Sequence, residues 1–260
     1  MSTTETPEQT IDRKREAARK ANRTTYWLAK HWLLMVNTLV GVFVLLPFVA
    51  PVFMHLGLEA PGRAIYVMYM AFCHQFPQRS YFFFGPQLMY SLEDVARVWP
   101  EIQNPLVLRQ FVGTPEMGWK VAWSDRMVSM YGGIFLFGLL YGLVRRVRTI
   151  RPLPWWGMVL LAVPMGIDGV THVISDLFGL GQGFRYTNEW LADLTNYAFS
   201  MDFYVGNGLG SFNWWMRLIT GLLFALGIVW LAYPHLEFAF DQTRRQIEAK
   251  FRHAGLSLDE

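Results

Sequence analysis

The sequence predicts an all-α integral membrane protein, a polytopic bundle of four transmembrane helices with a short re-entrant or fifth helix. Three observations lead to this fold class. Only 17% of the 260 residues are charged while 53% are hydrophobic, whereas soluble domains have about 25% charged residues. No charged residue occurs between His31 and His55, a run long enough for a helix to cross about 30 Å of hydrocarbon. Basic residues also flank the apolar segments, as the positive-inside rule requires.

Three further segments are long and apolar enough to span, namely residues 127–144, 153–177 and 214–233. The apolar segment 64–84 is different, because Cys-His-Gln, Pro77 and Arg79 interrupt it. We therefore expect it to form a short helix that is re-entrant or lies on the surface. If it crossed fully, the chain would have five spans, and the arginines that follow residue 144 would lie opposite the basic N-terminal tail.

Charge and hydropathy divide the chain into a membrane domain with two tails. The predicted parts are a basic N-terminal tail at 1–31, a helix bundle at 32–233 with insertions at 85–125 and 182–213, and an amphipathic C-terminal tail at 234–260. Basic clusters occur in both tails and at 145–151. Four spans place all of them on one side, so both termini are expected in the cytoplasm and both insertions outside.

Each insertion is expected to contain a helix. Ser91 with Asp94 three residues later is typical of a helix start, since the hydroxyl caps free backbone N–H groups, and residues 188–199 favour a second helix. Both insertions are rich in aromatic residues. These indicate either a belt at the membrane interface or a docking surface for another protein.

Polar residues inside or beside the apolar segments mark the candidate site, since a charged group at a helix centre costs about 2.5–3.5 kcal/mol to insert. With four spans, all of them lie toward the outer side, which predicts one shared site. Nine residues make up this set: Cys73, His74, Gln75, Arg79, Asp125, Arg126, Asp168, His172 and Arg217.

Asp168 and His172 are four residues apart, so on a helix they lie on the same face. A carboxylate and an imidazole at this spacing can bind a metal, relay a proton or pair with the arginines. Together with Cys73 and His74 they are a conceivable metal set, but with a single cysteine in the chain we favour a structural Asp–Arg–His network. No cofactor follows from the sequence, and a pigment or haem carrier rests only on the histidines and aromatic content.

Four segments in order resemble the motifs of an uncharacterised prokaryotic membrane family, the domain of unknown function 2085. They are the Cys-His-Gln…Pro-x-Arg-Ser segment at 73–82 and the segments 125–133, 164–169 and 213–221. The resemblance implies a multi-pass protein of the prokaryotic inner membrane and a candidate site, but no activity. Relatives carry Cys-x-Arg-Cys where this chain has Ser124-Asp125-Arg126-Met127, so this member lacks two thiols.

These features favour an accessory or structural subunit of a larger membrane complex, with lipids and other membrane subunits as partners. The missing thiols, the aromatic insertions and the lack of a known catalytic motif all point in this direction. The alternative is a membrane-embedded enzyme, or a carrier of a small solute or lipid head group, that uses the outer Asp/His/Arg cluster; whether the chain is an enzyme stays open. Its basic residues do not alternate with aromatics, so we expect no nucleic-acid partner.

Overall fold

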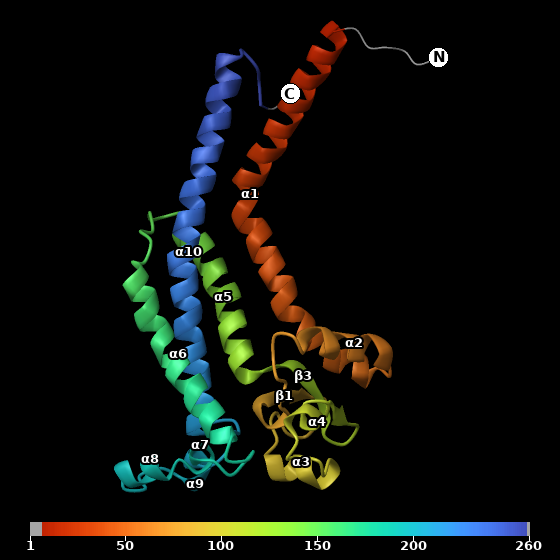
Figure 1. The fold of residues 1–260 in the computed structure, drawn as a ribbon, viewed down its shortest axis with the longest axis vertical. Coiled ribbons are helices and arrows are strands. Elements are labelled where there is room, and N and C mark those ends of the chain that lie inside the picture. Colours follow the sequence, from red (N-terminus) through yellow and green to blue (C-terminus); the bar gives the residue numbers. More distant parts are fainter. Residues whose placement is uncertain (1–6, 259–260) are drawn as a thin grey trace.

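Four long helices form the body of the computed structural model, which describes residues 7–258 (Figure 1). Each is long and apolar enough to cross a membrane, so the four-span prediction is confirmed. They are α1 (Pro7–His55), α5 (Asp125–Val144), α6 (Trp155–Asp176) and α10 (Phe212–His253). The segment at 64–84 does not span, because α2 (Glu59–Tyr69) has only 11 residues and is about 16 Å long.

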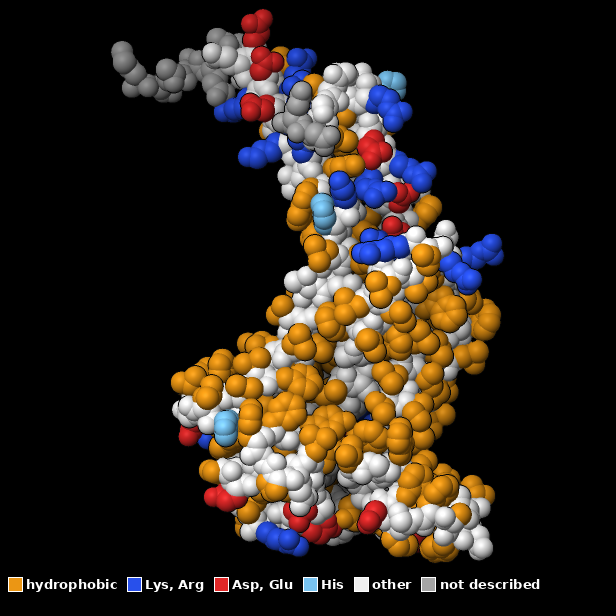
Figure 2. Space-filling view, turned by 180° about the vertical axis from the view of Figure 1, so that it is seen from behind, with side chains coloured by type: hydrophobic (Ala, Val, Ile, Leu, Met, Phe, Trp, Pro, Cys, Tyr) orange, Lys and Arg blue, Asp and Glu red, His pale blue; other side chains and the backbone are white. Residues whose placement is uncertain are grey.

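Helices α5, α6 and α10 pack side by side, and α1 joins them along α5 (Figure 1). A cluster of buried rings and aliphatic side chains from α1, α5 and α10 closes the bundle around Trp32, Tyr141 and Tyr233. The outer faces remain apolar, and hydrophobic side chains cover the middle of the molecule between charged ends (Figure 2). A helix bundle with apolar residues outside requires hydrocarbon as its solvent.

At the end that carries both chain termini, here called the termini end, α1 and α10 extend beyond the other helices (Figure 1). Tyr26 of α1 donates to Glu248 of α10 at 3.0 Å, and the guanidinium of Arg23 lies over the ring of Phe251. The segment 234–253, expected to belong to a separate amphipathic tail, continues α10 as one helix. Within this segment Ile247 and Phe251 are buried, whereas Phe238 is exposed.

The opposite end carries both insertions and is here called the insertion end. The first insertion was expected to be helical, but it also contains strands. Together with the residues just before it, it forms a small antiparallel sheet in the order β1-β3-β2. Its own elements are α3 (Leu92–Val98), α4 (Pro105–Leu108), β2 (Gly113–Thr114) and β3 (Gly118–Ser124). The 3₁₀ turn η1 (Pro77–Arg79) and β1 (Ser80–Phe83) belong to the preceding segment 64–84, so this segment, expected to form one short helix, is α-helical only as far as Tyr69. Strand β3 is almost entirely buried, so it lacks the polar–apolar alternation that identifies a strand in sequence. The predicted cap is correct, because Ser91 and Asp94 form a capping box.

The second insertion consists of three short helices, α7 (Phe184–Thr187), α8 (Glu189–Leu194) and α9 (Met201–Tyr204). The helix expected over 188–199 is shorter than predicted. Asn196 and Tyr197 have positive φ values of 50° and 56°, a backbone conformation that ends a right-handed helix. These short helices cover the insertion end beside α6 and α10 (Figure 1).

Candidate functional site

Spans and insertions bring the predicted polar residues together at the insertion end. The first turn of α5 supplies Asp125 and Arg126, the C-terminal half of α6 supplies Asp168 and His172, and the second turn of α10 supplies Arg217. The Cys-His-Gln segment follows α2 and precedes η1. The first turns of α5 and α10 and the last turns of α6 all lie at the insertion end, so the polar residues of the three helices lie at the same height along the bundle.

Asp168 is the centre of one buried ion-pair cluster. Its Oδ2 accepts from Nη2 of Arg126 at 2.7 Å, and its Oδ1 accepts from Nη2 of Arg185 at 2.6 Å. His172 Nε2 lies 3.8 Å from the same carboxylate, too far for a hydrogen bond. Asp168 thus holds two arginines in place, as the expected Asp–Arg–His network implies, and makes no direct proton relay with His172.

Asp125 and Arg217 form a second pair, and both side chains are 2% exposed. Arg217 Nε donates to both carboxylate oxygens at 2.8 Å, while its Nη1 and Nη2 donate to the side-chain and backbone oxygens of Asn207 at 2.9 Å. Arg217 therefore joins α10 to α5 and to the second insertion. All three guanidinium nitrogens of Arg217 donate hydrogen bonds to groups of the protein itself.

Arg79 makes a third, two-pronged pair that ties η1 to the end of α6. Its Nη1 and Nη2 donate to the two carboxylate oxygens of Asp176 at 2.9 and 2.8 Å. Bidentate pairs of this kind fix orientation as well as charge. The first insertion is thereby fastened to the same helix that carries Asp168.

Cys73 and Gln75 lie apart from these ion pairs and hold the loop against the sheet. Cys73 Sγ accepts from the backbone N–H groups of Gln75 and Ser124 at 3.3 Å, and Gln75 Nε2 donates to the carbonyl of Tyr66 at 2.9 Å. The conceivable metal set of Cys73, His74, Asp168 and His172 does not come together. Within residues 7–258, no group of three or more His, Cys, Asp or Glu side chains is placed to hold a metal.

A groove of about 830 Å³ runs beside the ion pairs between α5, α6, α10 and the first insertion, here called the insertion-end groove. Its walls are mostly aliphatic, and its polar end is lined by six of the nine predicted residues: His74, Arg79, Asp125, Arg126, His172 and Arg217. Four guanidinium groups, that of Arg185 included, face three carboxylates in this cluster. With the histidines neutral, the cluster carries one net positive charge.

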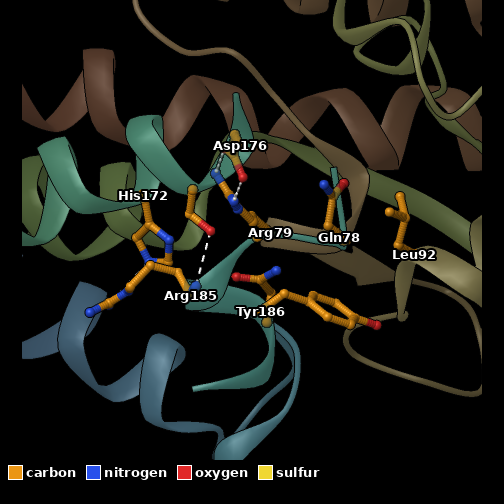
Figure 3. A pocket seen from close by; sticks show the side chains of 11 residues that line it. Gln78, Arg79, Leu92, His172, Asp176, Arg185 and Tyr186 are labelled. Carbon is orange, nitrogen blue, oxygen red and sulfur yellow. Dashed lines mark hydrogen bonds and ion pairs between the residues drawn. The ribbon is translucent and has the colours of Figure 1, made fainter. Parts of the chain in front are cut away.

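A much smaller cavity, of about 10 Å³, adjoins the groove at His172, Arg79 and Asp176. Figure 3 shows the residues around it, with Arg79 paired to Asp176. Four polar atoms of its lining have no partner among the described residues: Gln78 Oε1, Arg79 Nε, His172 Nδ1 and Arg185 Nε. Gln78, Tyr186 and Asn207 of the same small cavity also line a third cavity of about 440 Å³, here called the surface hollow. The small polar cavity thus shares lining residues with both the apolar groove and the surface hollow.

His74 lines the insertion-end groove, and its ring contacts that of Phe76 in a tilted arrangement with centroids 4.4 Å apart. Desolvation by the neighbouring groups lowers the pKa of His74, and the positive charges of Arg79 and Arg126 lower it further. These effects favour the neutral imidazole. It offers a hydrogen bond to a ligand without adding charge.

Sequence reasoning missed two members of the cluster, Arg185 and Asp176. Asp176 lies within the apolar segment 153–177, so the criterion of a charge in hydrocarbon applies to it as well, although it is not among the nine predicted residues. Arg185 stands in a polar insertion, where one more charged residue carries no signal. Only the folded contact with Asp168 reveals its role.

Comparison with known proteins agrees with the architecture. Residues 116–231 match the family described as Predicted membrane protein (DUF2085), a stretch that includes the last three motifs and excludes the Cys-His-Gln segment. The chain is 23% identical over 176 residues to the Uncharacterized protein MJ1492 of Methanocaldococcus jannaschii, covering 65% of this chain and 88% of that protein. No solved structure matches the chain. The chain is therefore an integral membrane protein whose residues 116–231 match the DUF2085 family, the family that its motifs resemble.

Proposed function

We propose that the insertion-end groove binds the anionic head group and upper chain of a membrane lipid, as a lipid carrier or membrane-embedded enzyme does. The observation that carries this proposal is the groove itself, which joins long aliphatic walls to a polar end with one net positive charge. An amphiphile with a negative head group complements both parts. A small hydrophilic solute would leave the aliphatic walls without a partner.

Arg126 is the residue that we assign to the head group. Only its Nη2 is bonded to Asp168, and its side chain keeps 13% of its surface exposed where it lines the groove. Arg217 is 2% exposed and fully bonded within the protein, so it positions other groups. A guanidinium is well suited to phosphate or carboxylate, since it presents several N–H donors in one plane.

The surface hollow next to the small polar cavity supports a site that is reached both from the membrane and from the insertion surface. A lipid enters the groove from the membrane, while water or a polar product passes near Gln78 and Tyr186 at the insertion surface. We infer from the basic residues at the termini end that this surface faces outward and that the chain resides in the cytoplasmic membrane of a prokaryote.

The proposal is tested by lipid affinity. The purified full chain is titrated with phosphatidylglycerol and with phosphatidylcholine, and bound lipids are counted by native mass spectrometry. Arg126→Gln should weaken phosphatidylglycerol binding about tenfold, which equals about 1.4 kcal/mol. The matched control is Arg97→Gln, which removes an arginine at the same end whose side chain is 77% exposed. This control should change the affinity for phosphatidylglycerol little. Equal losses in both variants would contradict a specific site.

The accessory-subunit function predicted from the sequence is a second candidate. It is favoured by exposed apolar side chains on the second insertion, among them Leu194 (76%) and Phe199 (54%). Purification in mild detergent after crosslinking, followed by mass spectrometry, tests this function. A stoichiometric partner that is lost in a Leu194→Glu/Phe199→Glu variant supports it, whereas a single-chain species in both samples contradicts it.

A further inference from the structure

A second groove lies at the termini end, on the other side of the membrane from the first. It has a volume of about 460 Å³ and runs between α1 and α5. Leucines of both helices line its apolar part, and exposed ones such as Leu34 (65%) and Leu143 (60%) face outward. The apolar part of this groove therefore combines leucines of two neighbouring helices.

Cations line the rim of this groove, and none of its described lining residues is acidic. Lys30 of α1 and Arg146, just after α5, are exposed, and neither forms an ion pair with a described residue. Arg145 also lines the groove but is paired with Glu237, and its guanidinium lies over the ring of Trp32. Arg145 is therefore fixed to the bundle, while Lys30 and Arg146 remain available to an external anion.

We propose that this termini-end groove binds an anionic phospholipid, with its phosphate between Lys30 and Arg146 and one acyl chain along Leu33 and Leu139. Basic pockets between transmembrane helices on the cytoplasmic side are typical sites for anionic head groups. A free phosphate would leave the leucine walls unused, and a neutral phospholipid would leave both cations without a counter-charge. The site is independent of the insertion-end groove, from which it is separated by the length of α5.

The experiment measures phosphatidylglycerol binding to the purified full chain by native mass spectrometry, in an Arg126→Gln background so that the insertion-end groove contributes little. The double variant Lys30→Gln/Arg146→Gln should weaken binding about tenfold. The matched control, Lys250→Gln/Arg252→Gln, removes the same two charge types from exposed positions at the same end and should change binding less than about twofold.

Three outcomes overturn the proposal. Equal losses in the two double variants would show general attraction between basic residues and anionic lipid. Phosphatidylcholine bound as tightly as phosphatidylglycerol would show that the cations do not select the head group. Displacement of the lipid by inorganic phosphate alone would show that the leucine walls contribute nothing. Thermal unfolding of each variant is measured alongside, and unchanged unfolding with selective loss of lipid supports the site.

Discussion

Arg217 Nε on α10 lies 2.8 Å from both carboxylate oxygens of Asp125, the first residue of α5. Both side chains are almost fully buried, so each charge depends on the other for compensation. Asp125 also stands where a helix N-terminus favours a negative charge. The pair thereby fixes how the two central spans approach each other at the insertion end.

Breaking this pair should destabilise the bundle strongly. Asp125→Asn leaves a buried guanidinium without its carboxylate, and such changes cost about 3–5 kcal/mol. The comparison is Glu59→Gln, which breaks the exposed pair with Arg63 and should cost less than about 1 kcal/mol. Thermal unfolding in detergent checks both variants. Similar stabilities for the two would show that the buried pair does not hold α5 against α10.

Asp168 should couple energetically to Arg185. Asp168→Asn alone leaves both Arg126 and Arg185 uncompensated, whereas Asp168→Asn with Arg185→Gln removes one of these unpaired charges. The double variant should therefore lose less stability than the sum of the single losses, by about 0.5–3 kcal/mol. A double-mutant cycle of unfolding free energies measures this difference. Strict additivity would contradict the 2.6 Å contact between the two residues.

Gly169 allows Arg126 to approach α6. A Cβ at this position would lie 2.9 Å from Arg126 Nη1, whereas a Cβ at Gly166, one turn earlier, meets nothing within 4 Å. Since the end of an arginine side chain can move, Gly169→Ala should displace the guanidinium with a stability change of no more than about 1 kcal/mol. Lipid affinity at the insertion-end groove should fall for Gly169→Ala and stay constant for Gly166→Ala. Equal lipid affinities for Gly169→Ala and Gly166→Ala would show that Arg126 does not bind the lipid head group.

Lys120 of β3 should make the stability of the first insertion depend on pH. Its side chain is fully buried, and Nζ donates to the carbonyls of Gln75 and Arg109 at 2.7 and 2.8 Å. Burial lowers the pKa of Lys120 from 10.5 to about 7. Above this pH the folded protein binds fewer protons at Lys120 than the unfolded chain, so the free energy of unfolding rises as pH increases toward the unfolded pKa.

The measurement is thermal unfolding of the wild type and Lys120→Met from about pH 7 to about pH 10, the interval between the two pKa values. The wild type should gain stability relative to the variant across this interval. Because other groups titrate equally in both proteins, the difference between them isolates Lys120. A constant difference would show that Lys120 keeps its ordinary pKa when folded.

The spans and the level of the polar residues follow from the sequence because hydrocarbon permits few charges. The stretch between His31 and His55 has no charged residue, so each charged residue within the other apolar segments marks a candidate for the site. Which of these charged side chains pair with one another does not follow from the sequence. Asp168 has two arginine partners, one from α5 and one from the second insertion, and no local spacing relates them. Strand β3 was also missed, because burial on both faces removes its alternation.

The central claim, that the insertion-end groove selects an anionic lipid through Arg126, is tested most directly by photocrosslinking in native membranes. A photoreactive residue replaces Met165, which lines the groove, or Val163, which is exposed on α6 and does not line it. Lipids captured at Met165 should be enriched in anionic species relative to those at Val163, and Arg126→Gln should abolish the enrichment. The same lipid composition at both positions would contradict the claim.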